Sequence, residues 1–212
     1  DLVTDSLGNQ IIHIVFSNLP PFAVKIVTVE ADVDLLETPE ASEVSSVLWL
    51  GPEPFIETTD PEFKRLAPMF KAADEDVLAA DIFKWVSGNL RAAGYTPHDR
   101  GALYALKNKT GDCSEFAYLF VALCRANYIQ ARGVSGYICD RNQILKPDAY
   151  HDWAEFYDGK TWKLADPFNN IFGVKSSQYV AMRILGPKGD NPVGDYPRFR
   201  YQGEGLEARM ND

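Results

Sequence analysis

The chain has 212 residues, of which 46% are hydrophobic and 24% charged, a composition typical of a globular protein that buries a core. Its formal net charge of −9 disfavours nucleic acid or an anionic membrane surface as the main partner. No stretch approaches the ~18 consecutive apolar residues of a transmembrane helix, so we expect no insertion into a membrane.

The first 60 residues are expected to form an N-terminal β segment followed by a long connection. Two strand-like runs, Gln10–Phe16 and Val24–Leu36, are separated by two prolines, where a strand cannot continue. Residues 37–60 are rich in Pro, Glu, Ser and Thr. We therefore divide the chain into a segment 1–60 and a main domain 61–212.

Helical signals follow in the next part of the chain. Asp60-Pro61 is typical of an N-cap followed by proline at the first helical position, and predicts a short helix to about Ala67. A longer helix is expected to start near Asp74, with apolar residues at helical spacing, and to end at Gly94. The connection after it contains a short helical piece around Leu103–Lys107.

A cysteine stands at the start of the next predicted helix, which runs to about Asn127. Asp112 can act as the N-cap and Glu115 as its partner three residues later, in a capping box. Cys113 is then the first helical residue, where free N–H groups and the helix dipole favour the thiolate. The helix is apolar on nearly every face, so we expect it to be buried.

A β-hairpin is predicted around Asp158-Gly159, which separates two runs of strand-forming residues. If these two residues form the loop, Tyr157 pairs with Lys160, and His151 lies directly opposite Asp166 on one face. Opposed Cβ atoms are about 4.5–5.5 Å apart, which allows a carboxylate to accept a hydrogen bond from an imidazole.

The same register decides between two candidate acids. Asp152 points to the other face of the hairpin and is therefore a poor candidate for orienting His151. Trp153 shares the face of His151, where it can shield the Cys–His pair or simply pack. A slip of one residue would reverse these assignments. Beyond the hairpin, Gln178–Leu185 and Arg198–Met210 have the pattern of further strands.

These motifs closely resemble the transglutaminase-like core over about residues 75–170. The matching blocks are Gly111-Asp112-Cys113-x-Glu115-x-Ala117, Ala122–Ala126, Ile129-x-Ala131-Arg132-x-Val134-x-Gly136-Tyr137, His151-x-Trp153-x-Glu155 and Asp166-Pro167. The superfamily shares the papain-like arrangement, with the order Cys, His, Asp. The chain departs from it at Tyr128 and Gln130, where Gly and Pro are frequent, which should alter the exit of the helix but not the chemistry.

The resemblance implies an α+β fold, with a buried central helix packed on an antiparallel β-sheet and an N-terminal β segment before it. It also implies that Cys113 is the nucleophile, His151 the general base and acid, and Asp166 the residue that orients His151. The expected reaction is acyl transfer on an amide or peptide bond through a thioester.

Stabilising the oxyanion of such a reaction requires two donors. The backbone N–H of Cys113 at the helix N-terminus is the natural first donor. The second donor stays open among Trp85, Tyr104 and Asn108, all of which precede the nucleophile.

Three hypotheses about the function involve these residues. With water as the acceptor of the acyl group, the protein is a cysteine peptidase or amidase. The resemblance to smaller bacterial members of the superfamily favours this hypothesis. With a primary amine it is a transglutaminase. The third reading is a catalytically silent binding or scaffold domain, which has no need of an intact Cys113, His151 and Asp166.

No cofactor or metal is expected, because the spacings between Cys113, Cys124 and Cys139 contain no zinc-knuckle motif. The expected partner is a protein or peptide substrate, and the oligomeric state is left open. The chain begins with Asp1 rather than Met, so a missing signal peptide does not argue against an extracytoplasmic location with the leader absent from this sequence.

Overall fold

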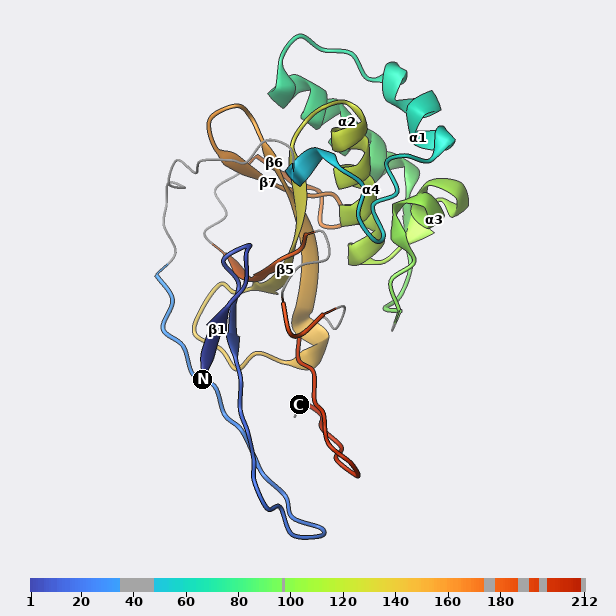
Figure 1. Ribbon diagram of the computed structural model, residues 1–212. Helices are drawn as coiled ribbons and strands as arrows, with labels where there is room; N and C mark the ends of the chain where they lie inside the picture. Colours follow the sequence, from blue (N-terminus) through green and yellow to red (C-terminus); the bar gives the residue numbers. More distant parts are fainter. Residues whose placement is uncertain (35–47, 97, 174–177, 187–190, 195–197, 211–212) are drawn as a thin grey trace.

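The structure is a computed structural model that describes residues 1–34, 48–96, 98–173, 178–186, 191–194 and 198–210. A layer of helices packs on one side of a five-stranded antiparallel sheet (Figure 1). The helices are α1 (Pro61–Leu66), α2 (Glu75–Asn89), α3 (Gly101–Asn108) and α4 (Cys113–Ala126). This arrangement confirms the expected α+β architecture.

The sheet has the strand order β8-β7-β6-β5-β9, and every neighbouring pair is antiparallel. Its strands are β5 (Ala131–Ile138), β6 (Tyr150–Tyr157), β7 (Trp162–Asp166), β8 (Ile171–Phe172) and β9 (Tyr179–Ile184). Two short pairs lie outside it. They are the antiparallel β1 (Leu2–Thr4) and β2 (Gln10–Ile12), and the parallel β3 (Arg91–Ala92) and β4 (Thr110–Gly111). Short 3₁₀ turns occur at Leu48–Leu50, Ala67–Met69 and Pro147–Ala149.

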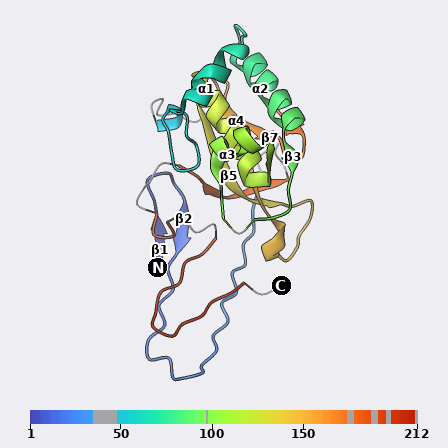
Figure 2. The ribbon, with the colours of Figure 1, turned by 90° about the vertical axis from the view of Figure 1, so that its right-hand side faces the viewer.

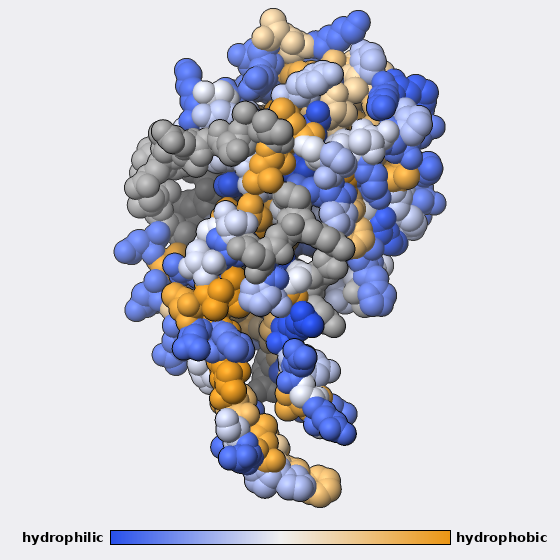
Figure 3. Space-filling model, viewed as in Figure 1, coloured by the Kyte–Doolittle hydropathy of each residue, from blue (hydrophilic) through white to orange (hydrophobic). Residues whose placement is uncertain are grey.

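The N-terminal β segment is much shorter than predicted. Of the first run only Gln10–Ile12 forms a strand, and Val24–Asp34 contains none, while residues 35 and 36 lie outside the described part of the chain. Residues 13–34 instead form an extended arm that leaves the body of the molecule (Figure 2) and carries exposed hydrophobic side chains (Figure 3). An isolated two-stranded ribbon buries too little surface to be stable, which explains why strand-forming residues are not enough here.

The N-terminal hairpin is attached to the sheet through one asparagine. The Asn9 side chain donates to the Ile184 carbonyl at 2.9 Å and accepts from the Ile184 N–H at 2.7 Å. Its side-chain amide thus pairs with Ile184 in the way that the backbone of a residue on a strand next to β9 would. At the other end, the predicted strand Arg198–Met210 is wrong, because the described residues 198–210 pair with no strand.

The N-cap predicted at Asp60 is present, and Asp74 also caps the helix that was predicted to start near it. The Asp60 carboxylate accepts from the Glu62 N–H at 2.9 Å, and Asp74 accepts from Asp76 N–H at 2.9 Å. However, α2 ends at Asn89 rather than at Gly94. The reason is that Arg91–Ala92 is extended and pairs with Thr110–Gly111, the two residues that lead into the N-cap of α4.

Helix α4 is the centre of the core, as predicted. Every residue from Ser114 to Arg125 is buried, and the helix contacts α2, α3 and the face of the sheet formed by Ala154 and Phe156. A smaller apolar cluster lies on the opposite face of the sheet and consists of Val134, Trp153, Leu164 and Tyr179. The two faces of β6 therefore have different environments, one against α4 and one against this second cluster.

The hairpin β6–β7 has a longer loop than predicted, and its register differs. Tyr157 pairs with Trp162 rather than with Lys160, because four residues form the turn. The Asp158 carboxylate accepts from the N–H groups of Lys160 at 2.8 Å and Thr161 at 2.7 Å, which stabilises the wider turn. The error amounts to two residues, so every side chain keeps its predicted face.

No helix of the described residues is long and apolar enough to cross a membrane.

Candidate active site

Cys113 occupies the first position of α4, as the sequence predicts. The N-cap carboxylate of Asp112 accepts from Ser114 N–H at 3.1 Å, and the fully buried Glu115 accepts from Asp112 N–H at 3.1 Å. Glu115 also pairs with the Arg100 guanidinium. A Cβ on Gly111 would lie 2.3 Å from the Glu115 Cβ, so glycine is required before this cap. These contacts fix the backbone that carries the thiol.

The surroundings of the Cys113 thiol are acidic, which the sequence did not indicate. Burial first, and then the negative charge of Asp152, raise the pKa of Cys113 to about 12. Backbone N–H groups of Asp152 and Ser114 that point at the sulfur counteract only part of this rise. The expectation of a thiolate favoured by the helix dipole is therefore wrong for the resting protein, in which Cys113 is a neutral thiol near pH 7.

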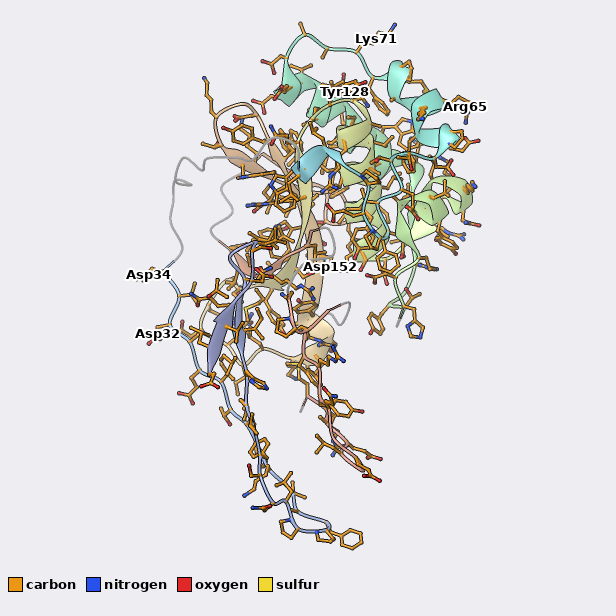
Figure 4. All side chains as sticks on the ribbon, viewed as in Figure 1. Asp32, Asp34, Arg65, Lys71, Tyr128 and Asp152 are labelled. Carbon is orange, nitrogen blue, oxygen red and sulfur yellow. The ribbon has the colours of Figure 1, made fainter. Side chains whose placement is uncertain are left out.

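Asp152 lies where the sheet meets the helical layer (Figure 4), on the opposite face of β6 from His151, as predicted. Its carboxylate accepts from the hydroxyls of Ser114, at 2.6 Å, and Ser135. Burial raises the pKa of Asp152, and the nearby charge of Asp112 adds to this effect. Asp152 is thus a neighbour of the Cys113 thiol. From the sequence it was excluded as the acid that orients His151, and no other role was considered for it.

Replacing Asp152 with asparagine should make Cys113 more reactive, because it removes a charge that opposes ionisation of the thiol. One nearby charge typically shifts a pKa by about 1–3 units, so we expect about 10- to 1,000-fold faster alkylation by iodoacetamide at pH 8. The rate is measured by mass spectrometry of the Cys113 peptide, with the exposed Asp140→Asn as matched control. An unchanged or slower rate in Asp152→Asn would contradict this electrostatic account.

His151 and Asp166 are in direct contact. His151 Nε2 lies 2.7 Å from Asp166 Oδ2, and both side chains are buried. The contact is confirmed, although the two residues are not directly opposite each other. The ladder between β6 and β7 begins at Ala154–Ala165, and Asp166 reaches His151 diagonally from the end of its strand.

Two residues that the sequence reasoning missed hold the Asp166 carboxylate. Asn169 donates to it twice, from its backbone N–H at 3.1 Å and from its side chain at 2.8 Å, and the Tyr179 hydroxyl donates at 2.8 Å. Burial alone would raise the pKa of Asp166, but these hydrogen bonds and those of His151 lower it. Asp166 is therefore an ionised, fully buried carboxylate with a fixed orientation.

The hydrogen bond to Asp166 uses Nε2 of His151 and leaves Nδ1 to exchange a proton with a thiol. Cys113 lies beside the backbone N–H of Asp152, the residue that follows His151. The Phe168 ring lies between His151 and α4. Its centroid is 6.0 Å from that of the His151 ring and 5.4 Å from that of the Phe116 ring on α4. Phe168 thus links the imidazole to the first turn of α4, at the end of the helix that carries the thiol.

A shallow hollow of about 510 Å³ adjoins this aromatic contact. Its lining combines apolar side chains with polar ones, namely Leu90, Ala92, Phe116 and Phe168 with Lys84, Ser87 and Asn170. Phe116 is three residues after the thiol, and Phe168 contacts His151. Phe116 and Phe168 thus give the hollow an apolar wall close to His151 and to the first turn of α4.

The three candidates for a second oxyanion donor are engaged elsewhere. Trp85 packs against Phe70 and the Lys109 ammonium, Tyr104 against the Arg100 guanidinium, and the Asn108 side chain donates to the Tyr104 carbonyl. None of them has a contact with Cys113 or His151 among the described residues. Trp153 is 1% exposed, with its ring stacked 6.3 Å from that of His151 and edge-on to Tyr179. It supports the imidazole from within the second apolar cluster.

Comparison with known proteins identifies the family. The model of the transglutaminase-like superfamily matches residues 65–167, which include α4, β6 and β7. Residues 65–167 therefore form a core of the transglutaminase-like superfamily. The comparison with curated protein sequences gave no match.

Two solved structures are similar to the chain, and the first of them, with a TM-score above 0.5, supports the fold. A predicted cysteine protease from Cytophaga hutchinsonii is 24% identical, with a TM-score of 0.53, and the alignment covers 73% of this chain and 58% of that protein. The periplasmic domain of TgpA from Pseudomonas aeruginosa is 23% identical, with a TM-score of 0.42 and coverage of 52% and 43%. The chain thus spans little more than half of the first of these proteins.

Proposed function

We propose that the protein is a cysteine-dependent acyl-transfer enzyme that acts on amide or peptide bonds. The observation that carries the proposal is the buried contact of His151 with Asp166, with the adjacent Phe168 ring packed on Phe116 in the first turn of the helix that begins with Cys113. A silent scaffold has no use for a buried carboxylate with three hydrogen-bonding residues around it. Membership in a superfamily with cysteine-protease and transglutaminase members supports the same reading.

In the proposed reaction His151 acts as a general base rather than as part of a preformed ion pair. Because the pKa of Cys113 is high, the thiol proton passes to His151 Nδ1 as the sulfur attacks the carbonyl carbon. The Cys113 N–H stabilises the oxyanion. The C–N bond then breaks, the proton moves from His151 to the leaving amine, and a thioester remains. An acceptor deprotonated by His151 attacks this thioester and restores the thiol.

Water is the acceptor that we favour, which makes the protein a cysteine peptidase or amidase. An amine acceptor is the second candidate, because the carboxylates of Asp112 and Asp152 lie near the thiol and would attract an ammonium group. In either reaction the hollow beside Phe168 would hold a side chain of the acyl donor. We propose an extracytoplasmic location and a protein or peptide substrate.

One experiment distinguishes hydrolysis, transglutamination and a catalytically silent scaffold. The protein is incubated with dimethylcasein and monodansylcadaverine, and both new amino termini and incorporated dansyl groups are measured. New amino termini that vanish in Cys113→Ala support hydrolysis, and dansyl incorporation that vanishes in the same variant supports transglutamination. If neither product forms and Cys113 resists activated esters as well, the proposed activity is wrong and the scaffold reading stands.

Replacing Tyr179 with phenylalanine tests whether the Tyr179 hydroxyl positions Asp166 and keeps its carboxylate ionised. The ring and its packing stay, but Asp166 loses one donor, so its pKa should rise. We expect the acid limb of the pH–rate profile to move up by about 0.5–1 pH unit. A merely structural residue would lower the rate equally at all pH values. Tyr201→Phe, at an exposed tyrosine, is the control.

A further inference from the structure

A second hollow, of about 440 Å³, lies between α1, α2 and the end of α3, and its lining combines cationic and apolar side chains. The cations are Arg65, Lys107 and Lys109. The apolar part consists of Leu66, Met69, Trp85 and Leu106. The hollow shares no lining residue with the one beside Phe168. It is therefore a separate feature of the surface.

The charge of this hollow is opposite to that of the whole chain. The protein has a net charge of −9, but three cations and a single carboxylate, Glu62, line the hollow. Glu62 is already paired with Arg65 at 2.8 Å. No carboxylate of the described residues forms an ion pair with Lys107 or Lys109. The hollow therefore offers uncompensated positive charge.

Lys109 is held in place among these groups. Its backbone is left-handed, with φ of 56°, and its N–H donates to the Ala105 carbonyl at 2.9 Å. Its ammonium lies 4.5 Å from the centroid of the Trp85 ring. Burial and the charge of Arg65 lower the pKa of Lys109, as expected for a cation next to another cation without a counter-ion.

The apolar part makes the hollow more than a site for a small anion. Leu66 and Leu106 are buried beneath it, Trp85 is half-buried, and Met69 is 65% exposed at its rim. An inorganic anion would leave these surfaces in water, whereas a peptide with a carboxylate beside an apolar side chain would use both parts.

We propose that this hollow binds an acidic peptide segment, with a side-chain carboxylate at Lys109 and Arg65 and a neighbouring apolar side chain on Trp85, Leu66 and Leu106. The binding does not depend on the proposed catalytic residues. Lys109 directly precedes β4, which leads into Asp112 and Cys113. An acidic substrate or partner protein would thus be held by a second contact close to the strand that positions the nucleophile.

Calorimetric titration of the full chain with the peptide Ac-Glu-Leu-Glu-Phe-NH₂ tests the proposal. The Cys113→Ala variant is used, so that turnover of the peptide cannot interfere and the result is independent of the proposed activity. We expect saturable binding that weakens about tenfold in Lys109→Gln and with the Gln-for-Glu peptide. Lys71→Gln, at an exposed lysine nearby (Figure 4), should leave the affinity unchanged.

Three results would overturn the proposal. They are the absence of saturable binding, equal binding by Lys109→Gln, and binding of inorganic phosphate as tight as that of the acidic peptide. Indole N–H shifts in NMR spectra, with Trp85→Phe to identify the signal, show whether the bound peptide contacts Trp85. Peptide-induced shifts that are confined to other tryptophans would place the peptide elsewhere and contradict the proposed site.

Discussion

Replacing Asp166 with asparagine should lower the rate of acyl transfer by about 10³- to 10⁴-fold without unfolding the protein. Asparagine has the same shape, and when its NH₂ group faces His151 its oxygen keeps the hydrogen bond from the Asn169 backbone N–H. It lacks the charge that holds the Nε2 proton of His151 and stabilises the imidazolium, and its amide can turn its NH₂ group toward Nε2. The proton would then move to Nδ1, which could no longer accept the thiol proton.

This prediction is checked with an activated ester, because the natural substrate is not needed. The rate of thioester formation on Cys113 with p-nitrophenyl acetate is compared between the wild type and Asp166→Asn, and circular dichroism verifies the fold. The exposed Asp140→Asn controls for the loss of one negative charge. A loss of less than about threefold would remove Asp166 from the mechanism.

Removing the Arg125 side chain should destabilise the protein strongly. Arg125 and Glu53 form an ion pair in which their side chains are 0% and 4% exposed, and Arg125 also donates to the carbonyls of Gly51 and Ala131. Burial lowers the pKa of Arg125 and raises that of Glu53. In Arg125→Ala the carboxylate and two carbonyls lose their partner, and we expect a loss of about 3–5 kcal/mol in the free energy of unfolding.

Urea denaturation measures this loss. Arg141→Ala is the matched control, since the Arg141–Asp140 pair is exposed and should change stability by less than about 0.5 kcal/mol. If Arg125→Ala does not fold, Glu53→Gln provides a milder test of the same pair. A loss below about 1 kcal/mol in both variants would show that the pair does not anchor residues 51–53 to α4.

The sequence predicted correctly those features of the structure that depend on residues close together in the chain. The caps at Asp60 and Asp112 depend on residues two or three positions away, and both are present. The alternation of side chains along β6 is also local, and it placed His151 and Asp152 on the correct faces. Because the register error was two residues, the predicted contact of His151 with Asp166 survived.

What the sequence could not indicate depends on contacts between distant segments. Tyr179 reaches Asp166 from β9, and nothing in its own neighbourhood marks it. Asn169 lies in the turn after Asp166-Pro167, where an asparagine that donates back is a usable signal. The high pKa of Cys113 arises first from burial and then from the tertiary position of Asp152, so a helix N-terminus alone gave the wrong direction.

The central claim is that Cys113 becomes acylated with His151 as its base, and one measurement tests it most directly. Wild type, His151→Ala and Cys113→Ala are mixed with p-nitrophenyl acetate near pH 7, and intact-protein mass and p-nitrophenolate release are followed together. The account predicts one acetyl group on Cys113 of the wild type, formed with a burst of p-nitrophenolate, about 100-fold slower formation in His151→Ala, and none at that position in Cys113→Ala. Equal rates in the wild type and His151→Ala, or acetylation at other residues only, would contradict it.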